Sequence, residues 1–226
     1  VLGLPDGDET LNSASALWTR PKKEITEEQY KEFYQHVGHG FDDPWMTVHM
    51  RAEGRLEYTM LLFVPGTRPL DLFQPERKCT VRLYVRRVFV TDDCEGLLPS
   101  YMRFVRGVID TEDIALNVSR EMLQRDPILA KIGAAVVKRV LAELEKKAKK
   151  DPEAYATFWE NFGPVLKEGL YEDKGRSDQL LGLARFHSTH GEGLVSLEDY
   201  ASRTAEEQEA IYTIAGDDVA ALRSSP

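Results

Sequence analysis

Two Asp-Pro pairs each stand at the start of a long segment with helical periodicity. Asp126–Pro127 precedes a segment in which apolar residues recur every three or four positions to about Lys150, and Asp151–Pro152 precedes a second such segment. An aspartate caps the free N–H groups of a helix start, and proline fits the first helical position. Gly163–Pro164 predicts the end of the second helix. The fold must therefore accommodate two long helices in succession.

The residues before this helical pair have mostly strand character. Residues 47–65 predict two strands joined near Glu53–Gly54, and residues 80–90 (TVRLYVRRVFV) predict one strand with alternating buried and partly solvated residues. Thr26 followed by Gln29 has the pattern of a capping box and predicts an earlier helix.

The residues after the helical pair predict smaller units. Ser177 and Ser196 each stand at a helix start, and residues 210–215 (AIYTIA) predict a late strand. The order is a mixed α/β block, a helical pair and a smaller α/β block, with a boundary near residues 150–170. This order predicts the α/β (α+β) class.

The composition excludes several classes of protein. The chain has 226 residues, 42% of them hydrophobic and 30% charged, which is typical of a soluble globular protein. Its net charge is 29 − 38 = −9, so it is a poor general binder of nucleic acid, although Arg82, Arg86 and Arg87 form a small basic set. No apolar run approaches the roughly 20 residues that a membrane span requires. Neither nucleic acid nor a membrane is an expected partner.

The cysteines and the chain ends suggest the context of the protein. Cys79 and Cys94 lack metal or redox spacing and favour reduced thiols in the cytoplasm. The first residues show no secretory signal and no starting methionine, and the last residues begin a helical pattern. We therefore expect a piece of a longer protein.

No common catalytic or nucleotide-binding motif is present. The chain lacks the nucleophile elbow GxSxG and the phosphate-binding patterns GxxxxGK[ST] and GxGxxG. His187 and His190 have a spacing that suits a shared metal, but no further ligand accompanies them, and ordinary hydrogen-bonding roles are favoured. No metal site is expected, and the chain shows no self-contained active site.

The segment LNVSREMLQ contains one arginine, Arg120, among apolar and small polar residues, with Gln124 one helical turn later. Two interpretations remain open from these residues alone. Arg120 is either a structural partner of Asp113 or Glu121, or a rigid donor fork that reaches the oxygens of a phosphate.

Several stretches resemble the middle segment of the heat-shock protein 90 chaperones. LYVRRVFV (83–90) and LNVSREMLQ (116–124) are the most specific, and LWTR (17–20), PLDLF (69–73) and SLEDYASR (196–203) follow in the same order and spacing. The resemblance runs from about Leu11 to the end, and it is strongest to the bacterial branch, because a short QPERK replaces the lysine-rich run of eukaryotic members.

The resemblance implies an organisation in four parts. Residues 1–10 form a disordered N-terminal end, and residues 11–125 form a larger αβα sandwich of ribosomal-S5-like type that carries the catalytic loop. Residues 126–168 form a helical connector, and residues 169–226 form a smaller αβα unit that is truncated at its C-terminus.

The resemblance also implies a catalytic role for the LNVSREMLQ loop. In this family, ATP and Mg are bound by an N-terminal domain and dimerisation is the work of a C-terminal domain, and this chain contains neither. Arg120 is expected to reach the γ-phosphate with support from Gln124, while Asn117, Ser119 and Glu121 shape the loop. The full-length protein is expected to be an ATPase, and this segment alone is expected to be inactive.

Unfolded client proteins are further partners that the resemblance implies. Phe41, Trp45, Leu70 and Phe89 fall in the corresponding regions, although buried packing is the ordinary role of aromatic residues. The alternative is a stand-alone protein-interaction module with no nucleotide role, in which Arg120 forms a permanent salt bridge.

Overall fold

The computed structural model describes residues 16–38, 42–74, 80–92, 96–115 and 126–224. A five-stranded sheet occupies its centre, in the order β1-β2-β5-β3-β4. The strands are β1 (Pro44–Ala52), β2 (Tyr58–Pro65), β3 (Thr80–Val85), β4 (Val88–Thr91) and β5 (Arg106–Thr111). β3 and β5 are parallel, and the other neighbours are antiparallel. The mixed α/β class is thus confirmed.

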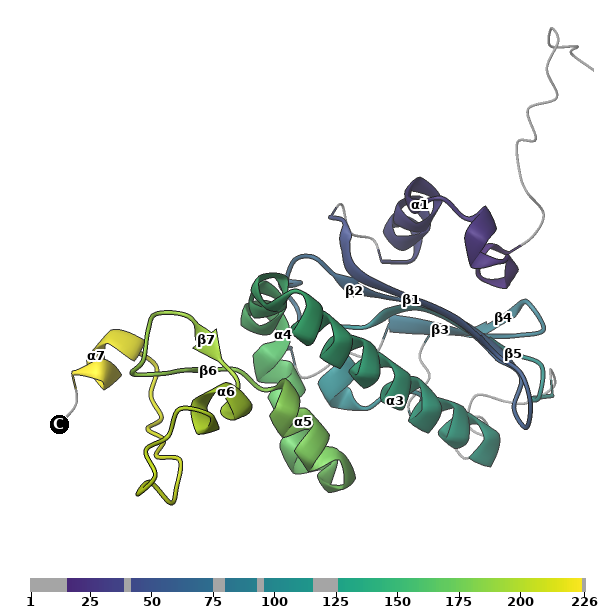
Figure 1. Ribbon diagram of the computed structural model, residues 1–226. Coiled ribbons are helices and arrows are strands. Elements are labelled where there is room, and N and C mark those ends of the chain that lie inside the picture. Colours follow the sequence, from purple (N-terminus) through teal and green to yellow (C-terminus); the bar gives the residue numbers. More distant parts are fainter. Residues whose placement is uncertain (1–15, 39–41, 75–79, 93–95, 116–125, 225–226) are drawn as a thin grey trace, which may run out of the picture.

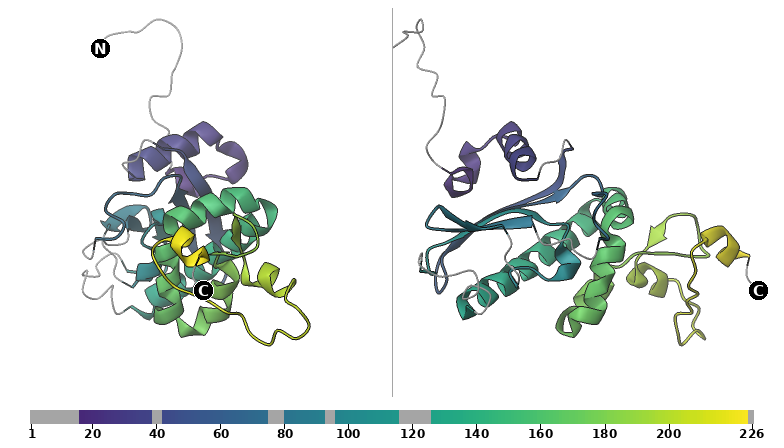
Figure 2. Two further views of the ribbon diagram at one scale, coloured as in Figure 1. Left: turned by 90° about the vertical axis from the view of Figure 1, so that its left-hand side faces the viewer. Right: turned by 180° about the vertical axis from the view of Figure 1, so that it is seen from behind.

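Helices cover both faces of this sheet (Figure 1). On one face lie the short 3-10 helices η1 (Leu17–Thr19) and η2 (Lys22–Glu24) and the helix α1 (Glu27–Gly38). On the other face lie α3 (Pro127–Lys150), α4 (Pro152–Glu172) and the 3-10 helix η3 (Ser100–Met102). The views from the side and from behind show the same three layers (Figure 2).

β2 explains why the sheet needs two helical layers. Met60, Leu62 and Val64 pack into the core with α3 and α4, whereas Leu61 and Phe63 pack against Trp18 of η1 and the residues of α1. All five of these β2 residues are at most 1% exposed. A strand buried on both faces is apolar throughout, which accounts for the unbroken run MLLFV.

The expected helix starts are present. Asp126 Oδ1 accepts from the Ile128 N–H at 2.7 Å, and Asp151 Oδ1 accepts from the Ala154 N–H at 3.0 Å. The capping box of α1 is confirmed, because the Gln29 N–H donates to Thr26 Oγ1 and the Thr26 N–H donates to Gln29 Oε1.

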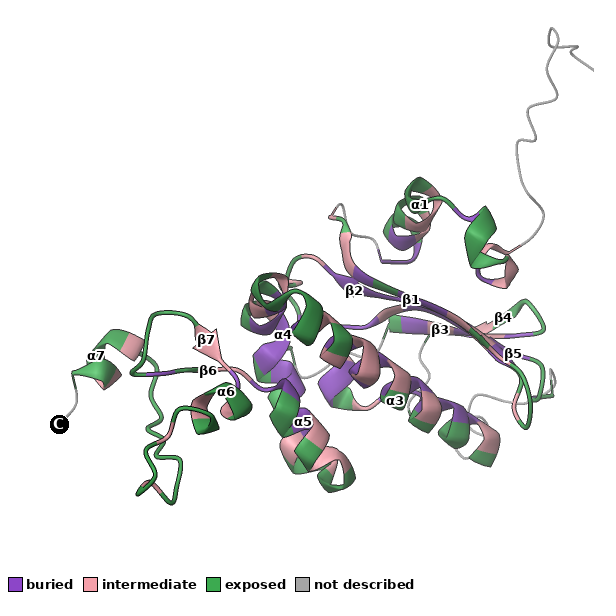
Figure 3. Cartoon of the chain, in the orientation of Figure 1, coloured by how far each residue is buried: buried purple, intermediate pink, exposed green. Residues whose placement is uncertain are grey.

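The remaining elements form the smaller end of the molecule. They are η4 (Lys174–Arg176), α5 (Ser177–Leu183), β6 (Phe186–His187), β7 (Leu194–Val195), α6 (Leu197–Ala201) and α7 (Val219–Arg223). The burial colouring shows this end to be largely exposed, while the purple faces of α3 and α4 turn toward the core (Figure 3). No helix in the described ranges has the length and apolar character required to cross a membrane.

Three sequence-based predictions of elements are wrong. Residues 80–90 are not one strand but the hairpin β3–β4, which turns at Arg86 and Arg87 with φ of 50° and 67°. α4 does not end at Gly163–Pro164 but continues to Glu172, because Val165, Leu166 and Gly169 remain on its buried face. The burial of these residues after Pro164 offsets the roughly 3 kcal/mol that a proline inside a helix costs. Residues 210–215 form no strand, since no described strand pairs with them.

The predicted boundaries at 125/126 and 168/169 stay predictions, as does the disorder of residues 1–10, which lie outside the described residues. α3, α4 and α5 contribute to the same core cluster as the sheet. The two helices of the expected connector therefore cover one face of the larger sheet.

Gly107 of β5 generates a stability prediction. A Cβ at this position would lie 2.2 Å from the Leu61 carbonyl oxygen, and φ is +132°. We expect Gly107→Ala to lower the free energy of unfolding by about 2–4 kcal/mol in urea titrations, because β2 and β5 cannot separate to admit the methyl group. Gly182→Ala is the control, since nothing lies within 4 Å of a Cβ there. Gly182 lies in α5, so this variant should gain up to about 1 kcal/mol. Equal effects would contradict the close approach.

Candidate functional site

The catalytic loop predicted from the sequence lies outside the described residues. Arg120 and Gln124, together with Asn117, Ser119 and Glu121, fall in residues 116–125, and Phe41 falls in residues 39–41. The structure describes the stem on each side of the loop. β5 ends at Thr111, Ile114 is 2% exposed, and α3 begins at Pro127.

The stem after β5 is fastened to the start of β2. The Thr111 hydroxyl donates to the Glu57 carbonyl oxygen at 3.0 Å, and the Glu112 N–H donates to the same oxygen at 3.2 Å. The Glu57 N–H in turn donates to Asp113 Oδ2 at 2.7 Å. Asp113, a structural partner considered for Arg120, therefore already binds the backbone of Glu57.

The end of the sheet at which this stem leaves also carries two turns. β3 runs parallel to β5, and β2 runs antiparallel to it. The β3–β4 turn and the β1–β2 turn consequently lie at the carboxyl end of β5. Between them is a shallow hollow of about 90 Å3, lined by residues that include Thr19, Arg51, Glu57, Arg86, Arg87 and Glu112. The lining carries both signs of charge.

Asp110 of β5 holds this end together. Its side chain is 7% exposed, and its Oδ2 accepts from the Trp18 indole Nε1–H at 2.8 Å. Its Oδ1 accepts from the Arg87 N–H at 3.1 Å. The carboxylate thereby supports the left-handed conformation of the turn, which costs non-glycine residues about 1–2 kcal/mol each.

The sequence interpretation missed Asp110 and Trp18 as site residues. An aspartate inside the apolar run of β5 was the available signal, because a buried carboxylate requires hydrogen-bond donors. Its partners lie 92 and 23 residues away in the chain. The spacing of neighbouring residues could not indicate them.

The basic set at 82–87 is divided by the fold. Arg82 is half-buried on β3, while Arg86 and Arg87 are exposed in the turn. The Arg86 guanidinium donates to the Glu112 carbonyl oxygen from Nε and Nη2, both at 3.4 Å. The turn therefore presents two guanidinium groups beside the stem of the 116–125 loop.

The apolar candidates differ in exposure. Leu70 is fully exposed and Phe89 is 48% exposed. Trp45 is half-buried, since its ring stacks on Phe158 at 4.7 Å and its Nε1–H donates to the Ala154 carbonyl oxygen at 3.1 Å. Phe73, three residues after Leu70, is 50% exposed beside Arg68.

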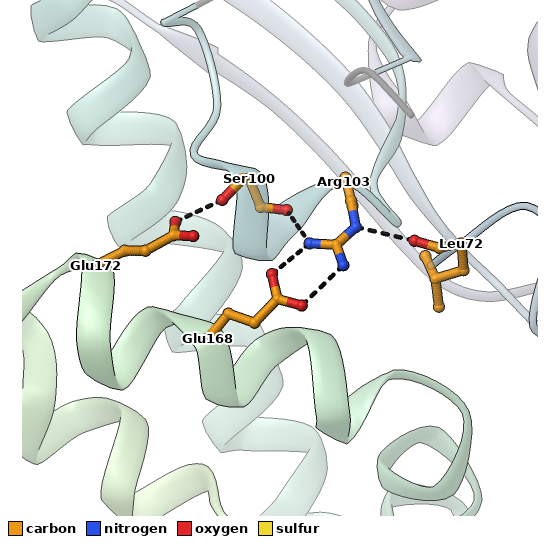
Figure 4. A network of polar contacts seen from close by, with 5 residues as sticks. All are labelled: Leu72, Ser100, Arg103, Glu168 and Glu172. Atoms are coloured by element: carbon orange, nitrogen blue, oxygen red, sulfur yellow. Dashed lines mark hydrogen bonds and ion pairs between the residues drawn. The ribbon is translucent and has the colours of Figure 1, made fainter. Parts of the chain in front are cut away.

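Arg103 binds the carbonyl oxygen of Leu72 and the carboxylate of Glu168 (Figure 4). Leu72 lies in the turn that also carries Leu70. The Arg103 Nε–H donates to the Leu72 carbonyl oxygen at 2.9 Å, and the Arg103 Nη2–H donates to Glu168 Oε1 of α4 at 2.8 Å. The Leu72 side chain is fully buried. The buried Leu72 therefore anchors the turn from which the side chains of Leu70 and Phe73 are exposed.

The Asp42 carboxylate likewise joins separate elements by hydrogen bonds, next in sequence to residues 39–41, which lie outside the described ranges. The Tyr34 hydroxyl donates to Asp42 Oδ1 at 2.8 Å, and the Gly66 and Thr67 N–H groups donate to Oδ2, both at 2.9 Å. Burial opposes ionisation of the Asp42 carboxyl, but the hydrogen bonds from Tyr34 and Thr67 hold its pKa below the usual value. The end of α1 is therefore tied to the end of β2.

No group of three His, Cys, Asp or Glu side chains in the described parts of the chain is arranged to hold a metal ion. His187 lies on β6, and the His190 N–H donates to Ser188 Oγ at 3.1 Å. The favoured prediction for both histidines remains ordinary hydrogen bonding.

The chain belongs to the Hsp90 family, since the family model described as Hsp90 protein matches residues 5–226. Its fold is that of a middle domain in this family. It is 28% identical to the middle domain of a heat shock protein of Plasmodium falciparum, with a TM-score of 0.80 over 90% of this chain and 80% of that one. The resemblance found in LYVRRVFV and LNVSREMLQ is confirmed.

Bacterial relatives are more similar in sequence. The chain is 62% identical over 226 residues to "Chaperone protein HtpG" of Paramagnetospirillum magneticum, covering 99% of this chain and 36% of that protein. It is also 62% identical over 218 residues to the protein of the same name in Rhodospirillum rubrum, covering 96% of this chain and 35% of that protein. The chain thus spans about a third of the length of these relatives and is similar to their middle segment.

The Trp18–Asp110 hydrogen bond generates a prediction. Trp18→Phe removes the donor to a buried carboxylate, and we expect the free energy of unfolding to fall by about 2–3 kcal/mol in urea titrations. Trp45→Phe is the matched control. It removes an indole bond to a neutral carbonyl oxygen at a half-buried position, so its cost should be about 1 kcal/mol. A Trp18→Phe cost no larger than that of the control would show that Asp110 does not depend on the indole.

Proposed function

We propose that this chain is the middle domain of an ATP-dependent molecular chaperone, and that it supplies Arg120 to the γ-phosphate of an ATP molecule held, with Mg, by a preceding N-terminal domain. The observation that carries the proposal is the placement of the loop stem. Residues 116–125 connect β5 to α3, and the stem leaves the sheet beside η1 and the Arg86–Arg87 turn. The first described residues of the chain and the base of the loop thus share one end of the sheet.

The anchored stem suits the delivery of an arginine. Residues 111–113 are held by hydrogen bonds to the backbone of Glu57, so the loop starts from a fixed base. A guanidinium fork matches phosphate oxygens in geometry and keeps its charge at all physiological pH values. It stabilises the charge of phosphoryl transfer once the domains dock, with Gln124 in support. Asn117 and Ser119 shape the loop, and Glu121 pairs with Arg120 while no nucleotide is near.

The hollow beside the loop stem is too small to be the nucleotide site. Its volume of about 90 Å3 is far below the roughly 300–1,000 Å3 of ordinary ligand pockets. The chain also covers about a third of its relatives' length, which leaves room for an ATP-binding domain and a dimerisation domain in the full-length protein. Such a protein would act in the cytoplasm as a homodimer.

Exposed apolar side chains support binding of unfolded clients by this domain. Leu70, Phe73 and Phe89 are each at least 48% exposed, and Arg103 anchors the turn that carries Leu70 through a hydrogen bond to the Leu72 carbonyl oxygen. Covering these exposed apolar groups with an unfolded client lowers the free energy, because their surface leaves water. Trp45 contributes less in this proposal, because Phe158 and Ala154 already contact it.

Steady-state ATPase of the full-length protein tests the role of Arg120. Arg120→Ala should lower kcat by about tenfold or more and leave ATP affinity nearly unchanged, because the arginine acts only in the docked state. Arg125→Ala is the control, since it removes the same charge from the same segment and should retain most of the activity. The 226-residue chain alone should neither bind nor hydrolyse ATP.

Two results would contradict this role. Normal turnover of Arg120→Ala would exclude delivery of the arginine. A lowered melting temperature together with unchanged ATPase would indicate the structural salt bridge of a stand-alone interaction module.

Suppression of client aggregation tests the apolar turn. Leu70→Ser should weaken the ability of the chain to suppress aggregation of a chemically denatured enzyme by about two- to fivefold, because roughly 1 kcal/mol of apolar contact is lost. Tyr171→Ser provides a matched control, since Tyr171 is 86% exposed on α4. Equal losses in both variants would show that general surface apolarity, and not this turn, binds clients.

A further inference from the structure

A buried histidine occupies the face of β1 that turns toward α1 and η1. Thr47 and Arg51, its neighbours two residues away on the same face, are exposed, whereas His49 is 7% exposed. Trp18 of η1 and Tyr30 of α1 contact it by hydrogen bonds, and they account for its burial. The proposed function gives this histidine no role.

Both ring nitrogens of His49 are engaged. His49 Nε2 lies 2.9 Å from the Trp18 carbonyl oxygen, and Nδ1 lies 2.8 Å from the Tyr30 hydroxyl oxygen. A carbonyl oxygen only accepts, so Nε2 carries the ring proton in the neutral form. Nδ1 is then the acceptor for the Tyr30 hydroxyl. These two bonds define one tautomer of a neutral imidazole.

Trp18 connects this histidine to the Arg86–Arg87 turn. His49 holds the Trp18 main chain, and Asp110 holds its indole. Asp110 also accepts from the Arg87 N–H. A continuous series of hydrogen bonds therefore runs from α1 through β1, η1 and β5 to the turn. η1 is the element of this series with the fewest residues, three in all.

The surroundings of His49 disfavour its charged form. Burial lowers the pKa of the imidazole, and the positive charge of Lys22 in η2 lowers it further, while the bond to the Trp18 carbonyl oxygen acts in the opposite direction. Tyr30 of α1 is the titratable group in contact, and burial raises the pKa of its phenol, so it stays neutral. Arg51 on β1 forms an ion pair with Glu53 at 3.0 Å. The Asp110 carboxylate of β5 accepts hydrogen bonds from the Trp18 indole N–H and from the backbone N–H of Arg87.

We propose that His49 is a proton-controlled latch: the neutral imidazole holds η1 on the sheet, and protonation releases η1 together with the support that Trp18 gives to Asp110. A proton on Nδ1 forces the Tyr30 hydroxyl to give up its role as donor, and it places a positive charge in a buried site beside Lys22. Lifting η1 returns the charged ring to water.

The direction of the pH dependence follows from linkage. The folded pKa of His49 lies below its ordinary value of 6.5, so the released state binds more protons between the two values. The latch is at full strength above about pH 6.5, and it weakens as pH falls toward the folded pKa. Within that window, the ratio of released to closed states rises by up to about tenfold for each pH unit.

Nitrogen-15 NMR of the 226-residue chain tests the latch. We expect the neutral His49 ring to carry its proton on Nε2. As the pH is lowered, His49 should take up its second ring proton at a lower pH than free histidine does. In the same transition, the Trp18 indole proton should lose protection by up to about tenfold per pH unit, relative to the exchange of free tryptophan at the same pH. Trp18→Phe identifies the resonance.

Two variants separate the latch from general acid sensitivity. His49→Gln keeps a donor for the Trp18 carbonyl oxygen but does not titrate, so its Trp18 protection should be independent of pH. His187→Gln removes an exposed imidazole on β6 and should keep the full pH response.

A neutral His49 protonated at Nδ1, a titration at or above pH 6.5, or Trp18 protection that stays constant through the titration would each overturn the proposal. A pH response that persists in His49→Gln would do the same. If that variant does not fold, the tautomer and titration of the wild-type chain decide alone.

Discussion

Burial of β2 on both faces is the constraint on which the rest of the structure depends. Its apolar side chains point alternately into the core shared with α3 and α4 and into the core shared with η1 and α1. One helical layer alone would leave the other face of β2 in contact with water, so both layers must pack against the sheet. Hydrogen bonds then join the elements at the carboxyl end of β5, where the loop stem, the Arg86–Arg87 turn and η1 meet. If residues 116–125 deliver Arg120 to another domain, as proposed, an anchored base would give that delivery precision.

Local signals predicted the elements that local interactions determine. The aspartates at 126 and 151 begin helices because their side chains bond to N–H groups two or three residues away. The β3–β4 turn was missed because two arginines in the left-handed region are unfavourable by themselves, and the compensating bond comes from Asp110, distant in sequence. The end of α4 was misplaced for the same kind of reason, since tertiary burial outweighs the local cost of Pro164. Residues 210–215 have strand composition, but composition does not provide a neighbouring strand.

The candidate functional residues also separate into those that local sequence indicated and those that only the fold reveals. A specific motif was sufficient to nominate Arg120 and Gln124, and their roles remain a prediction because they lie in residues 116–125, outside the described ranges. Residue type alone could not separate Leu70 from Trp45, because both are large and apolar and only the fold determines that one is exposed and the other stacked. The series from Tyr30 to Arg87 was not predictable at all, since each of its bonds joins residues at least 19 positions apart.

Asp110 gives this end of the sheet a physical means of coupling. Its two carboxylate oxygens bind different elements, Trp18 of η1 and the backbone of Arg87. Displacement of η1 would leave a buried carboxylate oxygen without its donor, at a cost of about 1–3 kcal/mol. The carboxylate can recover that energy only by turning toward another donor or toward water, and either movement weakens its bond to the turn. Any displacement of η1 would therefore alter the Arg86–Arg87 turn and the adjacent loop stem. The two states required for coupling are then one closed hydrogen-bond series and one in which Trp18 has left it.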